Sequence, residues 1–219
     1  DVGIGAVETI WTQGGLYTHQ TTAENVYIVS TSVADTGNTF SIEVLTDDYT
    51  KVNLNATPNG QTPVLLSGGT YKRFNRAINL SGVASQGDIY IYAGEGGATL
   101  GIPNDTSKIM TKITLGKEVS QNGVYTVPKG KRLIANTVRA YLGKNKDCNI
   151  SIYVYPKDNP VPFELIPYQL YQGILQDVFF SPPPYLEGTT FEFRATSSNN
   201  NTAVTISASS LLIDYPYAQ

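Results

Sequence analysis

Acid–base and nucleophilic chemistry in this 219-residue chain would depend on two isolated side chains, His19 and Cys148, the only histidine and the only cysteine. A serine–histidine–aspartate triad would have to use His19, and no Gly-x-Ser-x-Gly motif accompanies it. Cys148 would need a neighbouring base and a lowered pKa to act as a nucleophile. We therefore expect no catalytic residue: His19 is predicted to be exposed or hydrogen-bonded, and Cys148 to be a structural thiol that has no disulfide partner.

Two adjacent carboxylates, Asp47 and Asp48, are the best candidates for a cation site. On a strand they would point to opposite faces, whereas in a turn they could share a cation with Asp35 or Glu43. A calcium ion takes about six to eight oxygen ligands, and no EF-hand spacing is present. We expect turn chemistry here and no metal. The glycine-rich residues 94–97 are not followed by Lys-Ser/Thr or by a helical pattern, so we expect a linker and no cofactor site.

Residues 71–76 and 129–132 form two basic clusters. The aromatic residues within the first cluster suggest stacking on single-stranded nucleic acid. The chain as a whole has 15 Lys and Arg against 18 Asp and Glu, a net charge of −3, which opposes that interpretation. We predict solvated strand edges at both clusters and no nucleic-acid partner.

Tyrosine is abundant, with 15 residues. Tyr90 and Tyr92 alternate with isoleucines, and Tyr153 and Tyr155 alternate with Ile152 and Val154, so the tyrosines would line the second face of each strand. Such a face could be a protein interface, a sugar-stacking surface, or a face covered by a loop or a second sheet. Two further aromatic residues lie in a possible N-terminal arm, and one ends the proline-rich extended run 181–185. The candidate partner interface comprises Trp11, Tyr17, Tyr90, Tyr92, Tyr153, Tyr155 and Tyr185.

Alternating apolar residues predict the elements that would carry these side chains. Phe40, Ile42 and Val44 share one face of a strand, and similar alternation recurs around residues 150–154, 191–195 and 204–208. Asn-Gly dipeptides at residues 59–60 and 122–123 are typical hairpin turns. The segment 166–178 contains scattered apolar residues, but Pro167 and Gly173 interrupt any helical pattern. The fold class predicted is all-β, with two consecutive antiparallel β-sandwich units of jelly-roll or immunoglobulin-like type.

The glycine-rich residues 94–105 separate the two strand-rich halves. We predict an N-terminal β-sandwich with an N-terminal arm over residues 1–115 and a C-terminal β-sandwich over residues 116–219. No stretch reaches the roughly 18 apolar residues of a membrane span, so we expect no membrane partner. Residues 1–5 lack the basic and apolar regions of a signal peptide, and the chain either has a processed N-terminus or begins inside a longer gene product.

Five segments carry a resemblance to known proteins, in order along the chain. They are residues 8–17 (Glu-Thr-Ile-Trp-Thr-Gln-Gly-Gly-Leu-Tyr), 54–64, 74–77, 87–91 and 125–131, the last a tyrosine strand followed by a Pro-x-Gly-Lys turn. In these segments the chain resembles a family of virion structural proteins from tailed phages of marine and freshwater hosts, of the capsid decoration or head-fibre type. The family carries no catalytic residues that could be transferred to this sequence.

The resemblance implies a non-enzymatic protein on the outer capsid surface of a virion. As a capsid decoration protein, the chain would bind the major capsid protein and copies of itself, and lattice symmetry favours a homotrimer. The alternative is a tail, fibre or baseplate-associated protein that contacts host surface glycans. A glycan-processing enzyme that uses paired carboxylates is a third hypothesis.

Overall fold

The computed structural model of the chain describes residues 2–179, 184–198 and 202–214. Within these residues the secondary structure is almost entirely antiparallel β-strand, which confirms the predicted all-β class. One short 3-10 helix, η1 (Thr106–Lys108), interrupts the strands, and no helix of the described residues is long and apolar enough to cross a membrane. The chain divides into a middle unit, Tyr17–Asn122, and a terminal unit made of Asp1–Leu16 and Gly123–Gln219.

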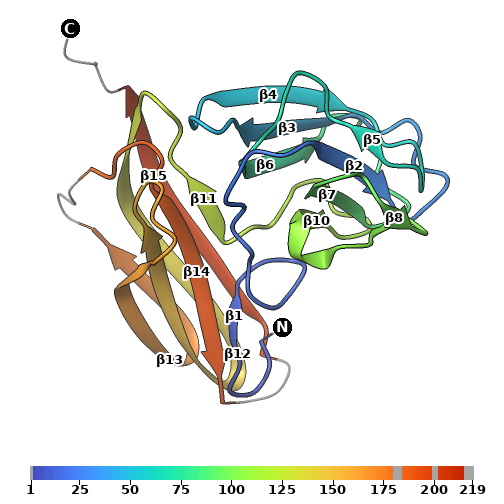
Figure 1. Cartoon of the computed structure of the whole chain (residues 1–219). Helices are drawn as coiled ribbons and strands as arrows, with labels where there is room; N and C mark the ends of the chain where they lie inside the picture. The colour runs from blue at the N-terminus through green and yellow to red at the C-terminus, as the bar shows by residue number, and fades with distance from the viewer. Residues whose placement is uncertain (1, 180–183, 199–201, 215–219) are drawn as a thin grey trace, which may run out of the picture. The chain divides into compact units, whose positions relative to one another are not determined.

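The middle unit is a sandwich of two antiparallel sheets, drawn as two layers in Figure 1. The sheet with strand order β4-β3-β6 contains β4 (Lys51–Ala56), β3 (Phe40–Leu45) and β6 (Arg73–Asn79). The sheet with order β10-β7-β2-β5 contains β10 (Ile109–Ile113), β7 (Ile89–Ala93), β2 (Val26–Ser30) and β5 (Val64–Leu65).

The core of the middle unit lies between these two sheets. Phe40 and Ile42 of β3 and Ile89 and Ile91 of β7 are fully buried in one apolar cluster. Alternation places these side chains on the inner face of each strand, as the sequence pattern predicts. Burying an apolar side chain of this size contributes about 1.5–3 kcal/mol to stability, so this cluster holds the two sheets together.

The terminal unit is built around β12 (Lys131–Tyr155), a strand of 25 residues. On one side β12 pairs with β13 (Phe163–Val178); on the other side it pairs first with β15 (Val204–Asp214) and then with β14 (Thr190–Ser197). Two short strands, β1 (Val7–Thr9) and β11 (Val124–Thr126), pair with β14. All six strands therefore belong to one sheet.

This sheet bends where its register is interrupted. Leu142 lies opposite Gly173 and Asp147 lies opposite Tyr171, so several extra residues of β12 stand against a short stretch of β13. Val138 and Ile152, on the two sides of the interruption, belong to the same apolar cluster. Residues before and after the bend thus share a core, so the terminal unit forms its two layers by folding a single sheet over itself.

The unit boundaries differ from the predicted division at residues 115 and 116. The N-terminal residues lie in the terminal unit because β1 pairs with β14, with Val7 opposite Thr196 and Thr9 opposite Arg194. The glycine-rich segment predicted to be a linker instead forms a hairpin of β8 (Ala98–Thr99) and β9 (Ile102–Pro103) inside the middle unit. Local alternation contains no information about pairing between residues almost 190 positions apart, which is why the sequence did not indicate this division.

Candidate interaction surface

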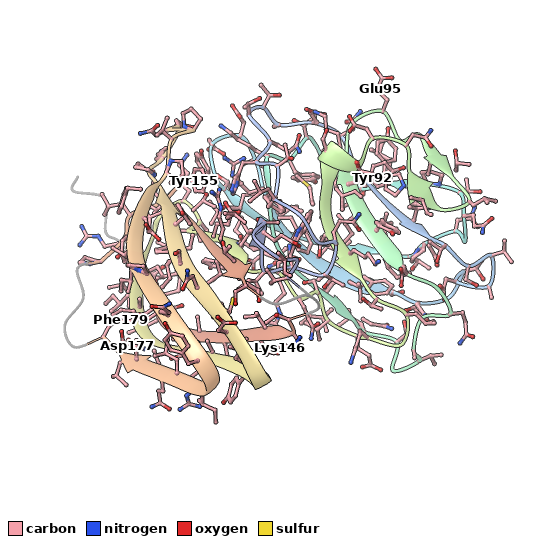
Figure 2. All side chains as sticks on the ribbon, turned by 90° about the horizontal axis from the view of Figure 1, so that it is seen from below. Tyr92, Glu95, Lys146, Tyr155, Asp177 and Phe179 are labelled. Carbon is pink, nitrogen blue, oxygen red and sulfur yellow. The ribbon has the colours of Figure 1, made fainter. Side chains whose placement is uncertain are left out.

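Tyr90 and Tyr92 are buried, so the structure does not place them on an interface. Only 6% and 2% of these residues is exposed, because both faces of β7 are covered. The Tyr92 ring lies 5.8 Å from that of Tyr27, and a Cβ atom at Gly96 would come within 2.7 Å of Tyr27, so the turn after β7 packs directly on this ring. Figure 2 shows Tyr92 in the middle unit and Glu95 pointing outward from this turn. Internal packing is therefore the correct interpretation here.

Tyr155 belongs to a polar cluster around the fully buried Glu192. One carboxylate oxygen of Glu192 accepts hydrogen bonds from the Thr9 hydroxyl and, at 3.0 Å, from Arg194 Nε. The other oxygen accepts from the Tyr155 hydroxyl at 2.9 Å and from Arg194 Nη2 at 2.9 Å. The Arg194 guanidinium also lies 4.3 Å from the centre of the Tyr153 ring. The cluster therefore joins β1, β12 and β14.

The electrostatics of this cluster favour the ion pair. Burial, followed by the negative charge of Glu192, raises the pKa of Tyr155, so its hydroxyl stays protonated and donates. Burial alone would lower the pKa of Arg194, but its hydrogen bonds and charge interaction with Glu192 raise that pKa overall. With four donors on the two carboxylate oxygens, the arrangement is a structural clamp that holds the N-terminal strand in the sheet.

The other predicted interface aromatics are also held within the fold. Tyr17 is buried, with its ring centre 4.9 Å from that of His19. The half-buried Trp11 donates from Nε1 to the carbonyl oxygens of Gly14 and Gly15 at 3.0 and 3.1 Å. Tyr185 is half-buried with its ring centre 4.7 Å from that of Phe191, while residues 181–183 of the proline-rich run lie outside the described residues. Trp11 and Tyr185 keep some exposure, but each is fixed by an internal contact.

The residues considered as a nucleophile or as metal ligands also serve the fold. Cys148 is buried, and burial raises the pKa of its thiol to about 11, so it is protonated at neutral pH. Asp48 accepts hydrogen bonds from Thr46 and Thr50, which is the turn chemistry expected from the sequence. In the described residues, no three His, Cys, Asp or Glu side chains gather as metal ligands would.

The basic cluster at residues 71–76 is partly drawn into the fold. Lys72 is 8% exposed, with its ammonium 3.4 Å from Asp47 and 5.2 Å from the centre of the Tyr49 ring. Arg73 Nη1 donates to the carbonyl oxygens of Gln20 and Lys72. The prediction of a solvated strand edge is therefore incorrect for Lys72, whereas Arg73 is only partly buried.

Exposed apolar side chains gather instead on the bent ribbon of β12 and β13. Tyr141 and Ile174 lie directly opposite each other on the outer face and are 41% and 70% exposed. Val178 continues the same face of β13, and Tyr171, 67% exposed, lies just before the bend at Gly173. We call Tyr141, Tyr171, Ile174 and Val178 the outer patch. The sequence pattern does not indicate the outer patch, because Pro167 and Gly173 interrupt the alternation of β13, the strand that carries three of its four members.

The comparisons with known proteins give little guidance. No family model matches the chain, and no curated protein matches it. Among solved structures, the chain has a weak similarity to a clostridial cysteine protease, Cwp84, after propeptide cleavage. The identity is 12%, the match covers 85% of this chain and 58% of that chain, and the TM-score is 0.20. This chain thus matches little more than half of that protein.

Proposed function

We propose that this chain is a non-enzymatic structural protein of a tailed-phage virion, a decoration protein that binds the major capsid protein on the outer capsid surface. The resemblance of five sequence segments to that family supports the proposal. The observation that carries it is the outer patch, where four large apolar side chains stand exposed on β12 and β13. Clusters of exposed apolar side chains are typical of protein-binding surfaces.

The surroundings of the outer patch fit a protein partner. Arg139 and Gln176 lie opposite each other on the same face, next to the pair of Tyr141 and Ile174, and both are exposed. A tyrosine-containing apolar centre with an arginine beside it has the composition of a protein interface. Each decoration contact buried across neighbouring capsid subunits must be broken before the shell can rupture, so binding stabilises the shell.

The direct test is binding of the purified chain to capsids assembled without it. We expect the double variant Tyr171→Ser/Ile174→Ser to bind at least ten-fold more weakly than the unmodified chain, because burying one such side chain contributes about 1.5–3 kcal/mol. Val33→Ser/Leu100→Ser is the matched control, because these side chains are 72% and 71% exposed in the middle unit. Equal binding by both variants would contradict the role of the outer patch.

The exposure of Tyr171 also favours a second candidate function, a tail or fibre protein that contacts host glycans. A tyrosine ring that is 67% exposed can stack on a sugar. In that case Tyr171→Ser would abolish binding of the purified chain to host cells, while Ile174→Ser would leave it unchanged. Binding to capsids that requires both side chains, without binding to cells, would exclude this alternative.

A further inference from the structure

β15 is a long edge strand, and most of its side chains are exposed. Its 11 residues pair with β12 from Asp214 opposite Lys131 to Val204 opposite Leu142. In the part of the chain that the structure describes, no other strand pairs with β15. Its second row of backbone N–H and C=O groups is therefore available to a further strand.

The sequence of β15 lacks the features that normally prevent such pairing. Residues 204–213 read Val-Thr-Ile-Ser-Ala-Ser-Ser-Leu-Leu-Ile and contain no charge, proline or glycine. Other outer strands of this chain differ: β13 contains Pro167 and Gly173, β4 begins with Lys51, and β10 contains Lys112. Charges, prolines and irregularities at edges oppose strand addition, so β15 is the long edge strand whose sequence does not oppose it.

Burial along β15 shows that the strand is uncovered on both faces at its centre. Alternation places Ala208 and Ser210 on the inner face, opposite Val138 and Ala135, and places Ser207 and Ser209 on the outer face. All four of these residues are exposed, as is Leu211, at 52%. A strand added at this edge would cover side chains on both faces at once.

We propose that β15 pairs antiparallel with β15 of a second copy of this chain, about a two-fold axis through Ala208. In this register Ala208 faces its own copy, Ser207 faces Ser209, and Ile206 faces Ser210. Thr205 then faces Leu211 and Val204 faces Leu212, so like charges do not meet anywhere between Val204 and Leu212. Asp214 lies beyond this segment and pairs with Lys131 of its own chain.

This self-complementarity is the reason for choosing a second copy over another partner. A two-fold antiparallel contact places each residue of the segment against another residue of the same segment, which a neutral segment with small central residues tolerates without a clash. The two terminal units would then share one continuous sheet, β13-β12-β15 followed by β15-β12-β13 of the partner. This pairing concerns the purified chain alone and does not depend on the proposed capsid function. It gives a dimer in place of the homotrimer expected from lattice symmetry.

Sedimentation of the full chain at high micromolar concentration tests the proposal. We expect a species of twice the 23.7 kDa mass of one chain. Ser207→Lys/Ser209→Lys places lysine against lysine across the axis and should weaken the dimer at least ten-fold. Gln169→Lys/Gln176→Lys, at exposed positions of β13, is the matched control and should leave the dimer intact. Circular dichroism would establish that both variants are folded.

Cysteine cross-linking tests the register itself, in a Cys148→Ser background. Residues that face each other across antiparallel strands have Cα atoms about 4.5–5.5 Å apart, within disulfide range. Copper–phenanthroline oxidation should therefore link two copies of Ala208→Cys. Two copies of Thr205→Cys would be about 20 Å apart and should not link. A monomer, a trimer, a dimer insensitive to the lysine pair, or equal cross-linking at both positions would overturn the proposal.

Discussion

Glu192 shows how a single residue can organise the terminal unit. Replacement by alanine leaves the Arg194 charge without its buried partner, and removing one member of a buried ion pair costs about 3–5 kcal/mol. We therefore expect Glu192→Ala to lower the free energy of unfolding by about that amount, measured by urea denaturation. Glu95→Ala, at the exposed turn after β7, is the control and should have almost no effect (Figure 2). Similar losses in the two variants would contradict the clamp.

Cys148 makes stability depend on pH in the alkaline range. Its pKa is about 11 in the folded chain against an ordinary value of 9.0, because burial disfavours the thiolate in the folded state. The contribution is fully present below pH 9 and is lost as the pH rises from 9 to 11, by at most about 1.4 kcal/mol per pH unit. Urea denaturation from pH 8 to pH 11 should show this decline, and Cys148→Ala should show a smaller one. An unchanged slope in the variant would refute the assignment.

At the scale of elements, Gly173 permits the bend of β13. Its φ of 101° lies where residues with a Cβ atom are strained, although the space around it is open. We expect Gly173→Ala to lower the free energy of unfolding by about 1–2 kcal/mol. Gly143→Ala, across the bend on β12, has no positive φ and serves as the control. Thermal melting of both variants measures the difference, and equal melting temperatures would show that the bend does not depend on Gly173.

The sequence predicts the positions of individual strands well, but it does not predict which other segments cover their faces. Alternation around Phe40, Ile89 and Ile150 identifies strands and their inner faces correctly, because the period of two follows from strand geometry. The same pattern cannot tell whether the second face is covered. Tyr92 and Tyr155 were therefore expected at a surface but are packed by segments whose positions depend on tertiary structure. The outer patch was not expected, because Gly173 interrupts the strand pattern in the sequence. In the fold, pairing with β12 on both sides of Gly173 keeps β13 a strand.

At the scale of the whole molecule, one unit is formed by a continuous segment of the chain and the other by two separate segments. The middle unit is continuous from Tyr17 to Asn122 and encloses its own core between two sheets. We expect the isolated fragment 17–122 to fold and to unfold cooperatively in urea. The fragment 123–219 lacks β1 and the Thr9 hydroxyl that contacts Glu192, so it should be less stable than the terminal unit in the full chain. An unfolded fragment 17–122 would contradict this division.

The most direct test of the central proposal is a cryo-EM reconstruction of the tailed-phage virion that we propose carries this chain, combined with a count of its copies. We expect hundreds of copies spread over the outer capsid surface, with the outer patch of β12 and β13 against the major capsid protein. A few copies at the tail or at one vertex would contradict decoration and favour the fibre alternative. Absence of the chain from the particle would refute a structural role in the virion altogether.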